Sequence, residues 1–138
     1  MKGKVVGSIR EAVALAGLKD GMTVSFHHHL RNGDYVLNLV MEAVAQLGIR
    51  DLTVNASSLF DIHLPLLDHI QSHVVTGIQT DYMSAALGRE ISRGVLERPV
   101  EFRTHGGGGP PPPPSPPPPP PRLIFPPPAA PQPHTPPP

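Results

Sequence analysis

The segment SFHHHLRNGDY places three consecutive histidines, His27, His28 and His29, just ahead of Arg31. Imidazole can ligate a metal, exchange a proton near neutral pH, or donate a hydrogen bond to an anion. A guanidinium two positions further on adds positive charge to the same loop. The loop is therefore the first place in the chain to look for a functional site.

A metal centre is one hypothesis for these histidines. Neighbouring side chains in an extended or irregular backbone diverge, so that of the three only His27 and His29 would share a face. Further ligands would have to come from His63, His105 or a carboxylate, and no recognised spacing connects them. We therefore expect no metal. A second alternative is structural, with at least one histidine packed under a sheet and the others solvated.

A helix N-terminus favours a third hypothesis. Gly33 and Asp34 open the clearest helical pattern in the chain, so that imidazoles, Arg31 and free backbone amides converge there. Asp34 complicates this, because its carboxylate can cap the first amides itself. The pattern indicates a site for an anionic or carbonyl-bearing ligand.

Strand and helix patterns alternate along the part of the chain that surrounds this loop. A Ser8 capping box starts the first helix, and Pro65 suits the first position of the third. The helix after Gly33 carries an apolar stripe, with Asn38, Glu42 and Gln46 on the opposite face. We expect helices at 9–16, 34–47, 66–70 and 83–93, strands at 22–26, 52–54, 74–80 and 100–103, and a polar turn at 55–58 (NASS).

This alternation predicts an α/β fold with a parallel sheet and right-handed crossovers. In such open sheets, ligands bind beyond the carboxyl ends of the strands. The histidines, NASS and the THGG segment that ends at Gly107 all follow predicted strands, so we expect them at that edge.

Composition separates a foldable part from a tail. The 138 residues include 21 prolines, nearly all of them after His105. A formal net charge of zero gives no electrostatic reason to bind nucleic acid or a membrane surface. Cysteine is absent, and no apolar run has the length of a membrane span or the form of a signal peptide. We expect a cytoplasmic protein.

The residues GLKDGMTVSFHHHLRNGDYVLNLVMEAVAQLG, followed by LTVNASSLFDIHLPLLDHI, VVTGIQT and GREISRGVLERPVEFRTHGG, resemble the N-terminal region of the citrate lyase alpha subunit family. The resemblance covers 1–107 and implies a CoA-transferase-like α/β domain, of which this is the N-terminal part. It also implies acyl exchange, in which citrate displaces acetate from an acetyl thioester on an acyl carrier protein.

The resemblance implies partners as well. The thioester belongs to a phosphopantetheine-derived group on the gamma subunit, so no cofactor is expected on this chain itself. The beta subunit then cleaves the citryl thioester to oxaloacetate and the acetyl thioester.

Such a reaction needs cations for a tricarboxylate and donors for a developing oxyanion. His27, His28 and His29 are the catalytic candidates. The substrate-binding candidates are Arg31, Gly33, Asp34, Arg89, His105, Gly106 and Gly107. Arg93 is a further possible clamp, although it and Arg89 can equally be solvated helix residues. Ser57 and Ser58 suit a turn better than a nucleophilic role.

The segment 108–138 departs from the family pattern and reads as a Pro-rich disordered tail. We interpret it as the product of a frameshift that truncates and impairs the enzyme and leaves a poorly stable sheet. The alternative is a non-catalytic interaction protein that uses this tail to dock in aromatic grooves.

Overall fold

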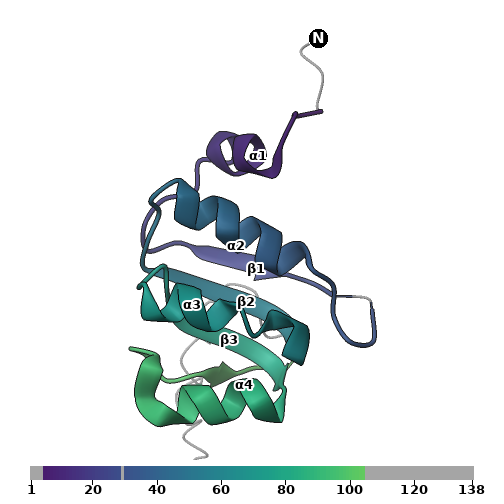
Figure 1. Cartoon of the computed structure of the whole chain (residues 1–138), viewed down its shortest axis with the longest axis vertical. Coiled ribbons are helices and arrows are strands. Elements are labelled where there is room, and N and C mark those ends of the chain that lie inside the picture. Colours follow the sequence, from purple (N-terminus) through teal and green to yellow (C-terminus); the bar gives the residue numbers. More distant parts are fainter. Residues whose placement is uncertain (1–4, 29, 105–138) are drawn as a thin grey trace, which may run out of the picture.

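The computed structural model describes residues 5–28 and 30–104, and within them helices and strands alternate (Figure 1). The predictions for His29, His105, Gly106, Gly107 and the tail 108–138 lie outside the described residues. The elements are α1 (Ile9–Leu15), β1 (Thr23–Phe26), α2 (Val36–Gln46), β2 (Leu52–Leu59), a 3-10 turn (Asp61–His63), α3 (Leu66–Gln71), β3 (Val75–Met83), α4 (Ala85–Glu90), a π turn (Ile91–Val95) and β4 (Glu101–Phe102).

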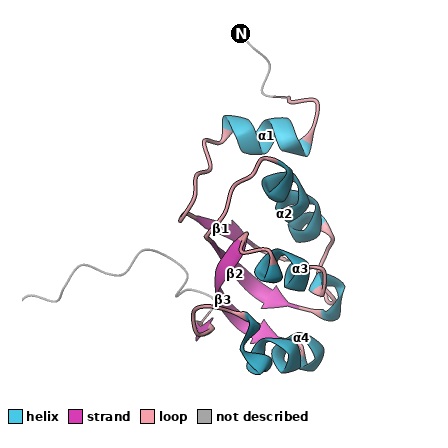
Figure 2. Cartoon of the chain, turned by 60° about the vertical axis from the view of Figure 1, so that its left-hand side comes forward, coloured by secondary structure: helices cyan, strands magenta, loops and turns pink. Residues whose placement is uncertain are grey.

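The strands form one parallel sheet in the order β1-β2-β3-β4, which confirms the predicted α/β class. Figure 2 shows α2, α3 and α4 on the same side of this sheet. Consecutive parallel strands joined by crossovers of one hand place every connecting helix on one face. The carboxyl ends of the strands therefore meet at one edge, where the β1–α2 and β2–α3 loops emerge side by side.

The polar turn expected at 55–58 is wrong, because these residues lie inside β2. Asn55 and Ala56 pair with Ser25 and Phe26 on one side, and β2 continues to pair with β3 as far as Leu59. Small polar residues favour turns locally, but ladder bonds to strands on both sides outweigh that preference. β3 likewise runs on past the predicted end of its strand to Met83.

The buried face of α2 matches the predicted apolar stripe in part. Val44 is buried, as are Leu37 and Met41, which widen that stripe. Val36 and Leu39, predicted in the same stripe, are about half exposed. Asn38, predicted on the solvent face, is buried. Together with α3, α4 and the strands, α2 encloses a core whose large, fully buried apolar side chains are Leu37, Met41, Val44, Leu52, Val54, Leu59, Leu66, Ile70, Val75, Ile78 and Leu87. Burying each large aliphatic side chain contributes roughly 1.5–3 kcal/mol.

Local start and stop signals agree with the structure in most places. The Ser8 hydroxyl accepts a hydrogen bond from the Glu11 amide at 3.1 Å, as the capping pattern predicts. Gly94, with a φ of 87°, ends the last helical stretch. Pro65 precedes α3 as its N-cap rather than lying at its first position.

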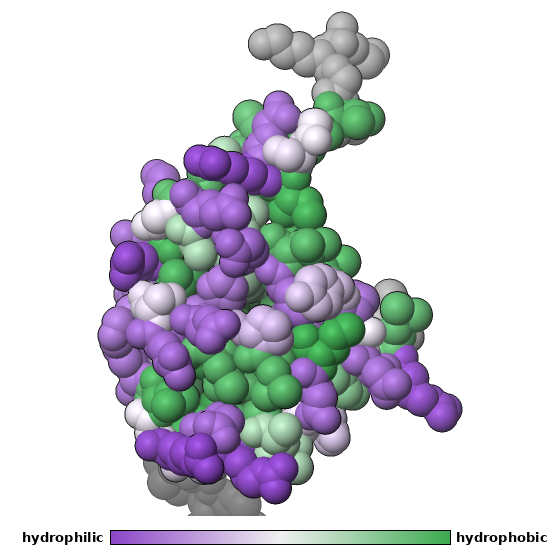
Figure 3. All heavy atoms as spheres, in the orientation of Figure 1, coloured by the Kyte–Doolittle hydropathy of each residue, from purple (hydrophilic) through white to green (hydrophobic). Residues whose placement is uncertain are grey.

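The helix-bearing side of the molecule mixes apolar and hydrophilic surface (Figure 3). Within the described residues, no helix is both long enough and apolar enough to cross a bilayer.

Candidate functional site

The histidine loop is fastened to the neighbouring strand at the carboxyl edge of the sheet. β1 ends at Phe26, which pairs with Ala56 of β2. Two residues later the His28 amide donates a hydrogen bond to the Ser57 hydroxyl at 3.1 Å. Ser57 therefore anchors the loop to β2.

The His28 ring is held by Asp34. The His28 Nδ1 and Asp34 Oδ2 atoms are 3.1 Å apart, and the His28 side chain is 2% exposed. The other carboxylate oxygen, Oδ1, accepts the Val36 amide at 2.9 Å and so caps α2. The hydrogen bond from His28, followed by that from the Val36 amide, lowers the pKa of Asp34. Because an ionised carboxylate only accepts hydrogen bonds, the proton of the neutral His28 ring lies on Nδ1.

His63, in the 3-10 turn after β2, completes the cluster. Its ring stacks on that of His28, with centroids 4.7 Å apart and an interplanar angle of 24°. The Phe60 amide donates to His63 Nδ1, and Nε2 lies 3.0 Å from the backbone carbonyl oxygen of Asp34. An amide N–H can only donate and a carbonyl can only accept, so the neutral His63 carries its proton on Nε2. Burial lowers the pKa of His63, and its bond to the Asp34 carbonyl opposes that shift only in part.

Gly33 allows the loop to approach His63 closely. Its φ is +77°, and a Cβ there would lie 2.7 Å from His63 Cε1 and 2.9 Å from Phe60 Cδ2. Such distances leave no space for any side chain. Gly33 therefore serves both the backbone conformation and the seating of the His63 ring.

Two buried polar atoms at this edge have no hydrogen-bond partner among the described residues. They are His28 Nε2 and Asn38 Oδ1, while the Asn38 amide nitrogen donates to the Ile62 carbonyl at 2.8 Å. Since nearly all buried polar atoms in proteins are paired, an unpaired one marks a place where a ligand or water belongs. The imidazole nitrogen that Asp34 leaves available is the unpaired one.

The remaining described candidates, His27, Arg31, Arg89 and Arg93, are exposed. His27 and Arg31 are exposed in the same loop. Arg89 and Arg93 are exposed on α4 and the π turn, and Arg93 forms an ion pair with Glu90 at 2.9 Å. Among the described residues, the hydrogen bonds and ring contact of His28 are made with Asp34, Ser57 and His63 and not with either arginine.

Sequence reasoning considered His63 as a metal ligand and did not connect it with Asp34 or Phe60. Both of its ring nitrogens are occupied by backbone groups. Across 5–28 and 30–104, no group of three or more His, Cys, Asp or Glu side chains could together hold a metal ion. No residue pattern in the sequence signals a contact between a side chain and a distant backbone carbonyl.

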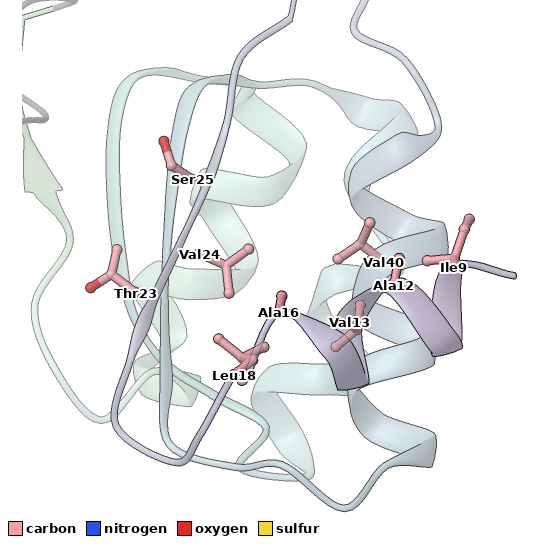
Figure 4. Close-up of a pocket in the computed structure, with 9 residues that line it drawn as sticks. All are labelled: Ile9, Ala12, Val13, Ala16, Leu18, Thr23, Val24, Ser25 and Val40. Atoms are coloured by element: carbon pink, nitrogen blue, oxygen red, sulfur yellow. The ribbon is translucent and has the colours of Figure 1, made fainter. Parts of the chain in front are cut away.

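A separate apolar pocket of about 480 Å³ lies between α1, β1 and α2 (Figure 4). It is lined by Ile9, Ala12, Val13, Ala16, Leu18, Thr23, Val24, Ser25 and Val40. None of these side chains titrates or carries a charge, so the pocket offers no group for acid–base chemistry. α1, which forms one side of the pocket, has no buried residue.

The fold and this edge define a parallel α/β protein with a histidine cluster at the carboxyl ends of its strands. Residues 2–109 match the family model of the citrate lyase alpha subunit, and the chain belongs to that family. The citrate lyase alpha chains of Haemophilus influenzae and Escherichia coli are each 48% identical to it over 103 residues.

A solved structure shares the fold. It is described as the alpha subunit of citrate lyase from Streptococcus mutans in complex with citrate, and it matches with a TM-score of 0.72 and 45% identity. The match covers 78% of this chain and 22% of that one. The two curated relatives are matched over 75% of this chain but only 21% and 20% of their own lengths. The chain thus spans about a fifth of the length of its relatives.

Proposed function

We propose that this chain contributes the histidine-bearing part of the site at which a citrate lyase alpha subunit exchanges acetate for citrate on an acyl carrier thioester. The observation that carries the proposal is the Nε2 of His28, which is buried and has no hydrogen-bond partner within residues 5–28 and 30–104. Asp34 holds this ring through Nδ1 at the carboxyl edge of a sheet that a citrate-bound relative shares. Family membership supplies the reaction class, and the site supplies a group suited to it.

The exchange needs no redox chemistry. A citrate carboxylate oxygen attacks the carbonyl carbon of the acetyl thioester and displaces the thiolate, which leaves a mixed anhydride of citrate and acetate. The thiolate then attacks the citryl carbonyl carbon of this anhydride and acetate leaves, so that citrate ends as the acyl group on the same sulfur. The protein must hold a trianion, orient one carboxylate towards the carbonyl carbon and stabilise the oxyanion that forms. A protonated His28 that donates a hydrogen bond from Nε2 would help either to hold the trianion or to stabilise the oxyanion. Arg31, exposed in the same loop, adds positive potential.

The remaining parts of the proposal follow from the family. The thioester would be presented by the phosphopantetheine-derived group of the gamma subunit, and the citryl product would pass to the beta subunit. Because the chain spans a fifth of its relatives, we propose that other groups of the acyl-transfer site come from protein beyond these residues, and that the chain alone is impaired.

The test is acetate release from acetylated acyl carrier protein on adding citrate. The 138-residue chain is compared with a chimera in which its residues 1–104 replace the matching part of the E. coli alpha chain. We expect activity from the chimera, and a loss of about 10²- to 10³-fold in the chimera carrying His28→Gln, as for removal of one oxyanion donor. His73→Gln is the matched control, because His73 is exposed before β3 at the opposite edge. Full activity of the His28→Gln chimera would contradict the assigned role.

A further inference from the structure

The hydrogen bonds around His28 and His63 determine where each ring carries its proton. Asp34 accepts from His28 with its carboxylate and from His63 with its backbone carbonyl, at 3.1 and 3.0 Å. The Phe60 amide closes the remaining nitrogen of His63. His63 thus has no free nitrogen, whereas His28 has a buried nitrogen, Nε2, with no partner in the part of the chain that the structure describes.

We propose that Asp34 and His63 act as positioning residues that fix His28 in the Nδ1–H tautomer, so that Nε2 enters the site as a lone pair and takes up a proton when a carboxylate binds. The ligand class is an anion that needs a hydrogen-bond donor, and citrate is the probe. This inference rests on the proposed function for its ligand, but its statement about tautomers concerns the free chain.

Two features make His28 and not His63 the ring that changes charge. Protonating His63 at Nδ1 would turn that nitrogen into a donor facing the Phe60 amide, and a 3.0 Å hydrogen bond would become a donor–donor contact. Protonating His28 at Nε2 breaks no hydrogen bond. The resulting imidazolium keeps the Asp34 carboxylate at Nδ1 and stacks on the neutral His63 ring.

The groups that touch the His28 ring come from two segments. Asp34, from the same loop, favours the charged ring, and neutral His63, from the 3-10 turn, faces it across the stack. Ser57 of β2 contacts the His28 backbone and does not titrate in the relevant range. An anion bound at Nε2 would be a second negative charge beside the ring and would favour the imidazolium.

The isosteric substitution Asp34→Asn tests whether Asp34 determines the tautomer of His28. The Asn amide has one acceptor, which the Val36 amide requires at the start of α2, so its NH₂ group must face His28 Nδ1. Nδ1 then becomes an acceptor, and the His28 proton moves to Nε2. We expect this variant to fold like the parent while its His28 tautomer is reversed, as occurs when an orienting carboxylate is replaced by an amide in a catalytic triad.

The experiment is long-range ¹H–¹⁵N NMR of the ¹⁵N-labelled 138-residue chain, with ring signals assigned from His28→Gln, His63→Gln and the control His73→Gln. We expect the neutral His28 proton on Nδ1, the His63 proton on Nε2 at every pH from about 5.5 to 8, and the reversed His28 tautomer in Asp34→Asn. Adding citrate to the parent chain at pH 8 should move the ¹⁵N chemical shift of His28 Nε2 towards the value of a protonated nitrogen. Sodium chloride at equal ionic strength is the control and should leave this shift unchanged.

Different results overturn different claims. A His28 proton on Nε2 in the parent, an unchanged tautomer in folded Asp34→Asn, or a charged His63 in the folded chain would each overturn the positioning assignment, whatever citrate does. An unmoved His28 Nε2 with saturating citrate would overturn the proton uptake. Failure of the chimera's acetate release, with the expected tautomers in place, would count against the proposed function alone.

Discussion

Replacing Gly33 with alanine tests how tightly the histidine cluster is built. The substitution adds a Cβ 2.7 Å from His63 Cε1, whereas ordinary contact begins at 3.4 Å. The ring must recede by about 0.7 Å, which would stretch one of its 3.0 Å hydrogen bonds beyond useful length. Loss of such a bond with a buried group left unpaired costs about 1–3 kcal/mol.

The matched control is Gly48→Ala. Gly48 has a φ of +75°, close to the +77° of Gly33, and a Cβ added there would meet nothing within 4 Å. Both variants therefore carry the same left-handed backbone penalty of about 1–2 kcal/mol, and only Gly33→Ala carries the overlap with His63. The difference between the two isolates the packing of the ring against the loop.

The measurement is urea unfolding of both variants and the parent, followed by circular dichroism and tyrosine fluorescence. We expect Gly33→Ala to lose about 1–3 kcal/mol more than Gly48→Ala, equivalent to roughly 4–8 °C per kcal/mol in the thermal midpoint of a domain this size. The His63 ring signals should shift in Gly33→Ala and stay in place in the control. Equal losses of stability in the two variants would refute the close approach on which the site rests.

Two further predictions concern the sheet and its pH dependence. Gly77→Ala would place a Cβ 2.9 Å from the Arg98 guanidinium, which is the end of a flexible side chain and can move aside. That movement would give up the hydrogen bonds from Arg98 to Thr53 and Thr76, so we expect a loss of about 1 kcal/mol in urea unfolding. Gly88→Ala, within α4 and 3.8 Å from its nearest neighbour, should be neutral or stabilising, and equal effects of the two variants would contradict the packing of Arg98 over β3. Burial lowers the pKa of both His63 and His69 in the folded chain. As pH falls below about 6.5, the pKa of an unfolded histidine, the unfolded chain takes up protons that the folded chain does not. The free energy of unfolding should therefore decrease, by up to about 1.4 kcal/mol per pH unit for each ring. Urea midpoints at pH 7.5 and 5 measure this, and a parent chain as stable at the lower pH as at the higher would contradict it.

The fold class could be predicted because periodicity and breakers agree over most of the chain. Apolar spacing located α2, and Gly94 and Ser8 marked helix ends where the structure has them. The NASS segment could not be read correctly, since its residues favour turns and only pairing on both sides makes them a strand. Asn38 was misplaced for a related reason, because its burial depends on a carbonyl of the 3-10 turn, that of Ile62.

The sequence indicated where the candidate residues lie in the fold but not how they bond to one another. Parallel strands bring the histidine loop and the end of β2 to one edge, as expected for an open sheet. The sequence alone could not choose among the histidines, because His28 is selected by its bonds to Asp34 and Ser57 and by the stack on His63. These contacts depend on how far β2 extends, which sequence reasoning underestimated.

Asp34 explains why so much of the chemistry depends on one short loop. Its three oxygen atoms serve three different elements: Oδ1 caps α2, Oδ2 holds His28, and the backbone carbonyl holds His63. The start of the helix, the orientation of one ring and the protonation of the other therefore cannot vary independently. The sequence indicated that the Asp34 carboxylate would compete with a ligand for the first helix amides. In the structure one of its oxygens does accept such an amide, but the other orients the His28 ring and leaves Nε2 of that ring available for a ligand.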